Sequence, residues 1–311
     1  MSLRKGEPSG RAFPAESKAA GRSFSRLLVT GAGGMLGKDV AAAARAAGHE
    51  VVSLARAELD VTDAGAVAAA LAAAAPAAIV NCAAWTDVDG AEQDPDGAAA
   101  VNATAAANVA RAAAELDARL VHISTDYVFA GDRPAGALPY VESDATGPHS
   151  VYGRTKLAGE QAVAAAGGSH AIARTSWLFG TGGGNFAATM LRLAAERDEV
   201  TVVDDQIGCP TATAHLAPAL LALALGDARE AQGIFHLAGG GAPVSWNAFA
   251  IEIFRQAGVT CRVLPCTTAE MPRPAPRPAF SALASERAEC PLLPPWQGGL
   301  SDFLNAREVH A

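Results

Sequence analysis

The amino-terminal half of this chain alternates short apolar runs with alanine-rich stretches, and no other feature of the sequence limits the available folds as strongly. The runs Arg26–Thr30, Glu50–Leu54 and Ala78–Cys82 have the length and composition of buried strands. Stretches beginning at Met35 and Ala64 lie between them and are rich in alanine, the residue with the highest helix propensity. Strands that alternate with helices predict an α/β fold built on a doubly wound parallel sheet.

The same pattern continues to about residue 174 and then loosens, which suggests two domains. The further expected elements are a helix over 96–116, a strand over 119–124, a helix over 150–166 and a strand over 170–174. We therefore expect a main domain over 26–173 and a smaller α/β domain over 174–305, from which the segment 233–238 returns to the main sheet. Residues 1–25 are expected to form a disordered extension and 306–311 a tail.

Composition excludes several classes of protein. The 311 residues include 32 acidic and 24 basic side chains, without a basic stripe, so nucleic-acid binding is not expected. The most apolar run, 64–80, is interrupted by Pro76 and is too short to span a membrane. Residues 1–25 lack the apolar core of a signal peptide, which predicts a cytoplasmic protein. The five cysteines lack metal-site spacing, so we expect reduced thiols and no bound metal.

A glycine-rich turn joins the first expected strand to the first expected helix. Its glycines Gly31, Gly34 and Gly37 follow the spacing GxxGxxG. Glycines at these positions permit a tight turn, close approach of a pyrophosphate to the backbone, and close helix packing, with the phosphates at the helix N-terminus. A glycine-rich turn without a ligand is the alternative, but the strand-to-helix context favours dinucleotide binding.

The end of the second expected strand bears on which dinucleotide is bound. An acidic residue there would bind the ribose 2′-hydroxyl of NAD, but the chain has Arg56, which can pair with the 2′-phosphate of NADPH. A solvated surface arginine is the alternative, and NADH stays open. Asp60 could meet the adenine amine, while Thr62 or Asp63 could cap the following helix.

Tyr152 and Lys156 lie four residues apart on an expected helix, so both side chains occupy one face. An ammonium group beside a phenol is expected to lower the pKa of the tyrosine and to make it an effective acid or base. Thr125 ends an expected strand and could donate a hydrogen bond to a substrate carbonyl, or could only satisfy nearby backbone.

No GxSxG turn surrounds Ser124, so a hydrolase is not supported. The acidic cluster at 87–92 is interpreted as a solvated loop, because it lacks calcium-loop spacing.

The glycine turn, the segment Ser124-Thr-Asp-Tyr-Val-Phe129 and Tyr152-Gly-Arg-Thr-Lys156, in this order, resemble the extended short-chain dehydrogenase/reductase superfamily. Within it the chain is similar to the dTDP-4-dehydrorhamnose reductase family. The similarity covers residues 26–305 and includes Val80-Asn-Cys-Ala-Ala-Trp-Thr86, Arg174-Thr-Ser-Trp177 and Asp205-Gln-Ile-Gly-Cys-Pro-Thr211. It implies a Rossmann-type sheet with a smaller substrate-binding domain.

The resemblance also implies roles for individual residues. Tyr152 would be the proton donor, Lys156 its pKa-lowering partner and a ligand of the nicotinamide ribose, and Thr125 the hydroxyl that polarises the carbonyl. Trp177 would touch the sugar nucleotide, with a buried core aromatic as the alternative. The remaining implied contacts are Gly34, Met35 and Leu36 with the pyrophosphate, Asp60 and Val61 with adenine, Ala83, Ala84 and Trp85 with the cofactor, and Thr125 and Asp126 with the sugar nucleotide.

The implied reaction is the NADPH-dependent reduction of the 4-keto group of dTDP-4-dehydro-L-rhamnose. Two alternatives stay open: a reductase or epimerase of another nucleotide-linked deoxysugar, and a non-catalytic regulator that resembles the beta subunit of methionine adenosyltransferase. The chain departs from the family where a magnesium-bridged dimer would need an acid, because Ala214 stands there although Asp39 is present. We therefore expect no metal and leave a homodimer open. Arg277-Pro278 and Ser281 match a carboxy-terminal pattern, but Ala282 replaces its second arginine.

Overall fold

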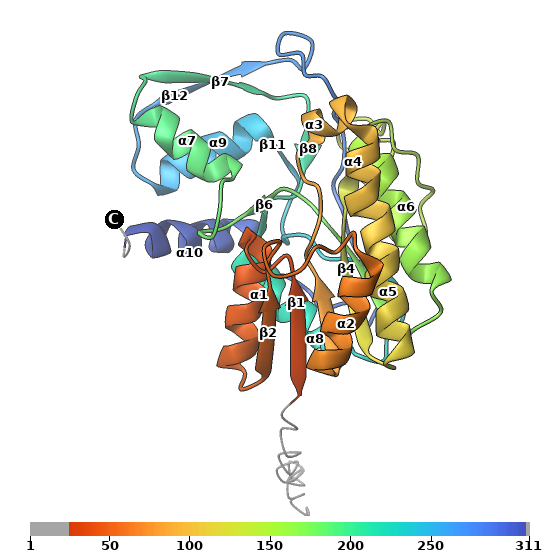
Figure 1. The fold of residues 1–311 in the computed structure, drawn as a ribbon. Coiled ribbons are helices and arrows are strands. Elements are labelled where there is room, and N and C mark those ends of the chain that lie inside the picture. The colour runs from red at the N-terminus through yellow and green to blue at the C-terminus, as the bar shows by residue number, and fades with distance from the viewer. Residues whose placement is uncertain (1–24, 309–311) are drawn as a thin grey trace, which may run out of the picture.

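The computed structural model describes residues 25–308 and is built around a six-stranded sheet (Figure 1). All neighbouring strands are parallel, in the order β10-β5-β4-β3-β1-β2. The predicted parallel α/β class is therefore confirmed, whereas the predicted extension over 1–25 lies, except for Ser25, outside the described residues. The strands are β1 (Arg26–Thr30), β2 (Glu50–Leu54), β3 (Ala78–Asn81), β4 (Arg119–Thr125), β5 (His170–Thr175) and β10 (Gly233–His236).

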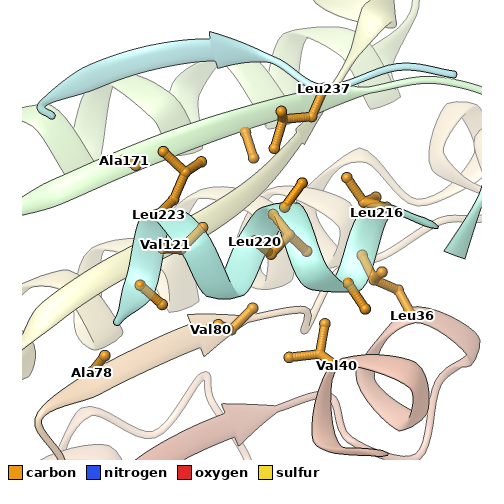
Figure 2. Packing of buried hydrophobic residues seen from close by; sticks show 14 of the residues in the cluster. Leu36, Val40, Ala78, Val80, Val121, Ala171, Leu216, Leu220, Leu223 and Leu237 are labelled. Carbon is orange, nitrogen blue, oxygen red and sulfur yellow. The ribbon is translucent and has the colours of Figure 1, made fainter. Parts of the chain in front are cut away.

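Helices cover both faces of this sheet because successive strand residues point to opposite faces and nearly all of those in β1, β3 and β4 are buried. Leu27 and Val29 belong to the core on one face, and Leu28 belongs to the core on the other. Figure 2 shows the first core, in which Leu216, Leu220 and Leu223 of one helix lie against the strands. The helices are α1 (Met35–Ala46) and α8 (Thr213–Ala224) on that face, and α2 (Ala64–Ala74), α5 (Ala105–Glu115) and α6 (Val151–Ala165) on the other.

Several helices begin at a side chain that caps the free amides of the first turn. Asp63 caps α2 and Ser150 caps α6, so Asp63 is the cap of the two residues that the sequence suggested. By contrast, α1 begins after Gly34, which has no side chain, and no acidic residue lies in its first turn. The first-turn amides of α1 therefore have no protein carboxylate or hydroxyl as a cap.

Two expectations about helices were wrong. The predicted helix over 96–116 is divided into α4 (Pro95–Ala99), a π-helical segment η1 (Ala100–Thr104) and α5. The Asn102 carbonyl in η1 lies 2.1 Å from where a Cβ on Gly159 would be, so the π turn lets α6 approach closely. The acidic residues at 87–92, predicted to be a solvated loop, cap and form α3 (Val88–Gln93). Asp87 caps this helix, and Glu92 accepts a hydrogen bond from the Val151 amide.

A smaller half lies over the carboxyl ends of the main strands (Figure 1). Its core is aromatic and includes Phe179, Phe249 and Trp296. No helix within residues 25–308 is long and apolar enough to cross a membrane. The remaining elements are the 3₁₀ turn η2 (Asp126–Val128), β6 (Leu178–Phe179), α7 (Phe186–Ala194), β7 (Glu199–Val203), β8 (Ile207–Gly208), β9 (Thr211–Ala212), β11 (Val244–Ser245), α9 (Trp246–Gln256), β12 (Arg262–Cys266) and α10 (Trp296–Glu308), which includes the first residues of the predicted tail.

Candidate active site

The glycine turn lies against the segment that follows β3. Gly31 has a φ of +63°, a conformation that favours glycine, and a Cβ there would lie 2.6 Å from the Ala83 amide nitrogen. A Cβ on Gly37 would lie 2.5 Å from the Gly31 carbonyl oxygen. The two glycines thus let the start of α1 lie close to Ala83, the first residue of the predicted cofactor segment Ala83–Trp85. This point lies at the carboxyl ends of β1 and β3.

This arrangement fits the pyrophosphate of a dinucleotide. The N-terminus of α1 has a positive dipole end and no capping side chain, so an anion can accept hydrogen bonds from its amides. Met35 and Leu36 stand in that first turn. The Asn185 amide of the smaller half donates to the Met35 sulfur at 3.7 Å, so Met35 lies where the two halves meet.

The predicted adenosine-side residues lie at the end of β2. Arg56 and Asp60 are both exposed, and the Arg56 charge helps to lower the pKa of Asp60. The larger cause is the Thr62 hydroxyl, which donates to Asp60 Oδ1 at 2.7 Å. Val61 is almost fully buried and packs in the core. Asp60 thus closes a local turn and presents its carboxylate to solvent beside a guanidinium.

Tyr152, Lys156 and Thr125 meet where α6 crosses the end of β4. The Lys156 ammonium donates to the Ile123 carbonyl oxygen at 2.6 Å. The Thr125 hydroxyl lies close enough to the Tyr152 phenol to act on it, and its effect is to lower the pKa of the phenol. The Tyr152 ring packs edge-on against Tyr127, with ring centroids 5.5 Å apart. An acid, a cation and a hydroxyl therefore surround one point at the carboxyl edge of the sheet.

The expected lowering of the Tyr152 pKa is wrong for this structure. Burial raises the pKa of the phenol to about 12, with a further increase from the Asp126 carboxylate, and this exceeds the opposing effect of Thr125. Burial also lowers the pKa of Lys156, to about 8. The sequence indicated that the two groups share a helix face, but the extent of their desolvation depends on the packed structure.

The predicted sugar-side residues flank this point. Asp126 is buried, with Oδ1 accepting from the Thr125 hydroxyl at 3.0 Å and Oδ2 without a protein partner. Burial raises the pKa of Asp126 to about 6, against the opposing effects of the Ser281 and Thr125 hydroxyls. Trp177 is half-buried rather than a core aromatic, and its φ of +47° is left-handed. Its ring stacks on Trp246 with centroids 3.5 Å apart.

Sequence reasoning missed several residues around the site. Trp246 was not identified, since its contact with Trp177 joins segments distant in sequence. Glu160 could have been found, because it lies four residues after Lys156 on the same helix. Arg277 was noted only as part of a pattern, and it pairs with Asp89 at 3.0 Å.

A cavity of about 600 Å³ lies away from this point, beside α6 and the strands β5 and β10. Leu157, Gln161 and Ile234 contribute to its lining, and none of the predicted site residues does. Within residues 25–308 no group of three or more histidine, cysteine or acidic side chains is arranged to hold a metal.

The parallel sheet, the glycine turn between β1 and α1, and a Tyr–Lys pair beside a strand-end hydroxyl define the short-chain class of nicotinamide-dependent oxidoreductases. Residues 25–309 match the family described as the RmlD substrate binding domain. The chain belongs to this family.

Known proteins agree with this assignment over most of their length. The chain is 46% identical to a dTDP-4-dehydrorhamnose reductase of Streptomyces griseus, over 90% of this chain and 93% of that protein. A Bacillus anthracis dTDP-4-dehydrorhamnose reductase, solved in complex with NADP, is 38% identical with a TM-score of 0.86, over 91% of this chain and 100% of that one. A probable dTDP-4,6-dihydroxy-2-methyloxan-3-one 4-ketoreductase of Streptomyces antibioticus is 42% identical, over 91% of this chain and 92% of that protein.

Proposed function

We propose that this protein reduces the 4-keto group of dTDP-4-dehydro-L-rhamnose to give dTDP-L-rhamnose, with NADPH as the reductant. The observation that carries the proposal is the meeting of Tyr152, Lys156 and Thr125 at the carboxyl edge of the sheet. The family membership and the names of the relatives supply the substrate class.

Each protein group has a distinct task in the proposed reaction. Bound NADPH supplies a hydride to carbon 4 of the sugar. Thr125 donates a hydrogen bond to the 4-keto oxygen and stabilises the negative charge that develops there. Tyr152 donates its proton to that oxygen, and its raised pKa keeps the proton on the phenol at neutral pH. Lys156, when ionised, stabilises the phenolate that proton donation leaves behind.

We assign the cofactor to the main domain, 26–173, and the sugar nucleotide to the region between the carboxyl ends of its strands and 174–305. Asp126 and Trp177 are proposed to contact the sugar, supported by the free Asp126 oxygen and the half-buried Trp177 ring. The proposed cofactor contacts are Gly31, Gly34, Met35, Leu36 and Gly37 with the pyrophosphate, Arg56 with the 2′-phosphate, Asp60 and Val61 with adenine, Ala83, Ala84 and Trp85 near the nicotinamide, and Tyr152 and Lys156 with its ribose.

The direct test is a coupled assay in which dTDP-4-dehydrorhamnose is generated in situ from dTDP-glucose and cofactor oxidation is followed. Tyr152→Phe should lower kcat by about 10² to 10⁴, because the acid is lost, while the Kd for NADPH stays within about twofold. Tyr140→Phe removes a hydroxyl away from the site and should keep full turnover. Undiminished turnover in Tyr152→Phe would overturn the proposal.

Arg56 gives a separate prediction about the cofactor. Arg56→Ala should raise KM for NADPH about tenfold and leave KM for NADH unchanged, because only NADPH carries the 2′-phosphate. Arg229→Ala, which removes an equal charge from another exposed position, should change neither constant. Equal changes in KM for the two cofactors would show that Arg56 does not bind the 2′-phosphate.

A second candidate substrate is another dTDP-linked deoxysugar ketone, which the name of the Streptomyces antibioticus relative suggests. Identification of the sugar product by NMR separates the two substrates. A non-catalytic regulator is disfavoured because the complete Tyr–Lys–Thr set is present, and such a protein would oxidise no NADPH in the assay.

We place the reaction in the cytoplasm, supported by five cysteines that are all free thiols. Sedimentation of the purified protein will decide whether it forms the homodimer left open above.

A further inference from the structure

The face of α6 that packs on the sheet carries a third functional side chain. Tyr152, Lys156 and Glu160 follow one another at four-residue spacing, which places them in one row along the helix. Lys156 is 2% exposed and Glu160 is 3% exposed. Two opposite charges therefore lie buried one helical turn apart, directly behind the proposed proton donor.

Glu160 is held in place by groups from two strands. Its Oε1 accepts from the Ser124 hydroxyl at 2.5 Å and from Arg174 Nε at 2.9 Å. Its Oε2 accepts from Arg174 Nη2 at 2.7 Å, which completes a two-point contact with the guanidinium. The carboxylate is thus fixed against a buried arginine, one helical turn from Lys156.

Lys156 needs an anion nearby, because the Ile123 carbonyl that it contacts is neutral and burial strongly disfavours an isolated ammonium. The titratable groups whose charges are coupled to it are Cys82, which directly follows β3, His122 from β4, and Glu160 on its own helix, whose row also includes Tyr152. Burial raises the pKa of Cys82 to about 12 and lowers the pKa of His122 well below its ordinary value, so both are neutral at pH 7. Glu160 is the anion of this group, and its charge is the main influence that raises the pKa of Lys156 against burial.

We propose that Glu160 is a positioning residue whose carboxylate, fixed by Ser124 and Arg174, keeps the buried Lys156 side chain ionised. The importance of this for catalysis rests on the proposed function, since it depends on the role of Lys156. The effect of Glu160 on the ionisation of Lys156 does not require substrate or cofactor, so it can be measured in the free protein.

Because Lys156, Glu160 and Arg174 carry three charges, the proposal predicts opposite shifts of the Lys156 pKa for two substitutions. Glu160→Gln removes the anion and leaves two buried cations, so Lys156 should release its proton more easily. Arg174→Gln removes the competing cation and leaves the anion, so Lys156 should hold its proton more tightly. A purely structural ion pair predicts no such opposition, because both substitutions break the same pair.

The chain contains four lysines, Lys5, Lys18, Lys38 and Lys156, which makes a direct titration feasible. The full-length protein, labelled with ¹³C at lysine Cε, is titrated by NMR, and the Lys156 signal is identified by its loss in Lys156→Met. We expect the Lys156 midpoint to fall by about one pH unit or more in Glu160→Gln and to rise in Arg174→Gln. Gln161→Ala, on the exposed side of α6, should leave it unchanged. An unchanged midpoint in Glu160→Gln, or shifts in the same direction in both variants, would overturn the proposal.

Activity provides a second readout. In Glu160→Gln the decline of kcat with rising pH should move to lower pH, and turnover should recover on acidification, whereas a folding defect would not be rescued by acid. Glu160→Asp should restore part of the wild-type profile. If circular dichroism shows that Glu160→Gln does not fold, Arg174→Gln decides alone: a raised midpoint supports the proposal, and an unchanged or lowered one rejects it. A protein that lacks reductase activity would fail in the assay and still titrate as described, so the two failures are distinguishable.

Discussion

At the scale of single residues, Lys156 combines a penalty for folding with a task in the proposed chemistry. Its ammonium is buried, and burial lowers its pKa from 10.5 to about 8. Such a shift means that the folded protein binds this proton less tightly than the unfolded chain does. A group that weakens the fold and lies at a site is expected to be retained for function rather than for stability.

Lys156→Met tests this trade-off. The variant should lose turnover yet be more stable than wild type by about 1–3 kcal/mol at pH 7, because an apolar side chain of similar length removes the desolvation penalty. Between pH 8 and 10.5 the unfolded wild-type chain binds more protons than the folded one, so wild-type stability rises with pH. The advantage of the variant should therefore be greatest below pH 8 and shrink towards pH 10.5. Urea unfolding at several pH values measures it, and a variant less stable than wild type at pH 7 would contradict the argument.

At the scale of elements, α6 lies close to its neighbours because glycines interrupt its surface. A Cβ on Gly153 would lie 2.3 Å from the Tyr127 carbonyl oxygen, and one on Gly159 would lie 2.1 Å from that of Asn102. Asn102 in turn donates to the Thr155 hydroxyl at 3.1 Å. The helix is thus held near the end of β4, and this places Tyr152 and Lys156 beside Thr125.

Gly159→Ala should disrupt this packing. Because the atom that the new methyl group meets belongs to backbone, the helix must shift, and we expect a loss of about 1–3 kcal/mol with a parallel loss of turnover. Gly298→Ala in the first turn of α10 is the control, since a Cβ there has open space and alanine has a higher helix propensity than glycine. Chemical denaturation of both variants makes the comparison, and similar stability changes in the two would refute the packing argument.

At the scale of the whole molecule, a proline-rich segment, 271–278, connects the smaller half to the main domain. Asp89 of α3 accepts from the Ala275 amide at 3.1 Å and from Arg277 Nη1 at 3.0 Å. The Arg277 charge also lowers the pKa of Tyr127, whose ring packs on Tyr152, although burial and Asp126 outweigh it. The segment therefore runs beside the proposed sugar site and is tied to the main domain by one carboxylate.

Asp89→Asn should loosen this link. We expect KM for the sugar nucleotide to rise up to about fivefold, the range of a partly exposed ion pair, with little change in the Kd for NADPH. Asp96→Asn changes the same charge at an exposed position and should leave both constants unchanged. An effect confined to NADPH binding would assign Asp89 to the cofactor side instead.

The sequence by itself determined the features that depend on local geometry. The parallel α/β class follows from the period of apolar residues, the turn at Gly31 from a backbone conformation that favours glycine, and the shared face of Tyr152 and Lys156 from the pitch of a helix. Each of these involves residues close together in the chain, so the amino-acid types alone are informative.

Only the tertiary structure decided the features that depend on contacts between distant segments. The π turn at η1 arises where α6 approaches it, and the raised pKa of Tyr152 comes from packing that the spacing of Tyr152 and Lys156 cannot report. The fixed position of Glu160 depends on Ser124 and Arg174, which lie on two different strands. Desolvation and ion pairing depend on what surrounds a group in three dimensions, and for this reason the sequence could predict the candidate site residues but not their electrostatics.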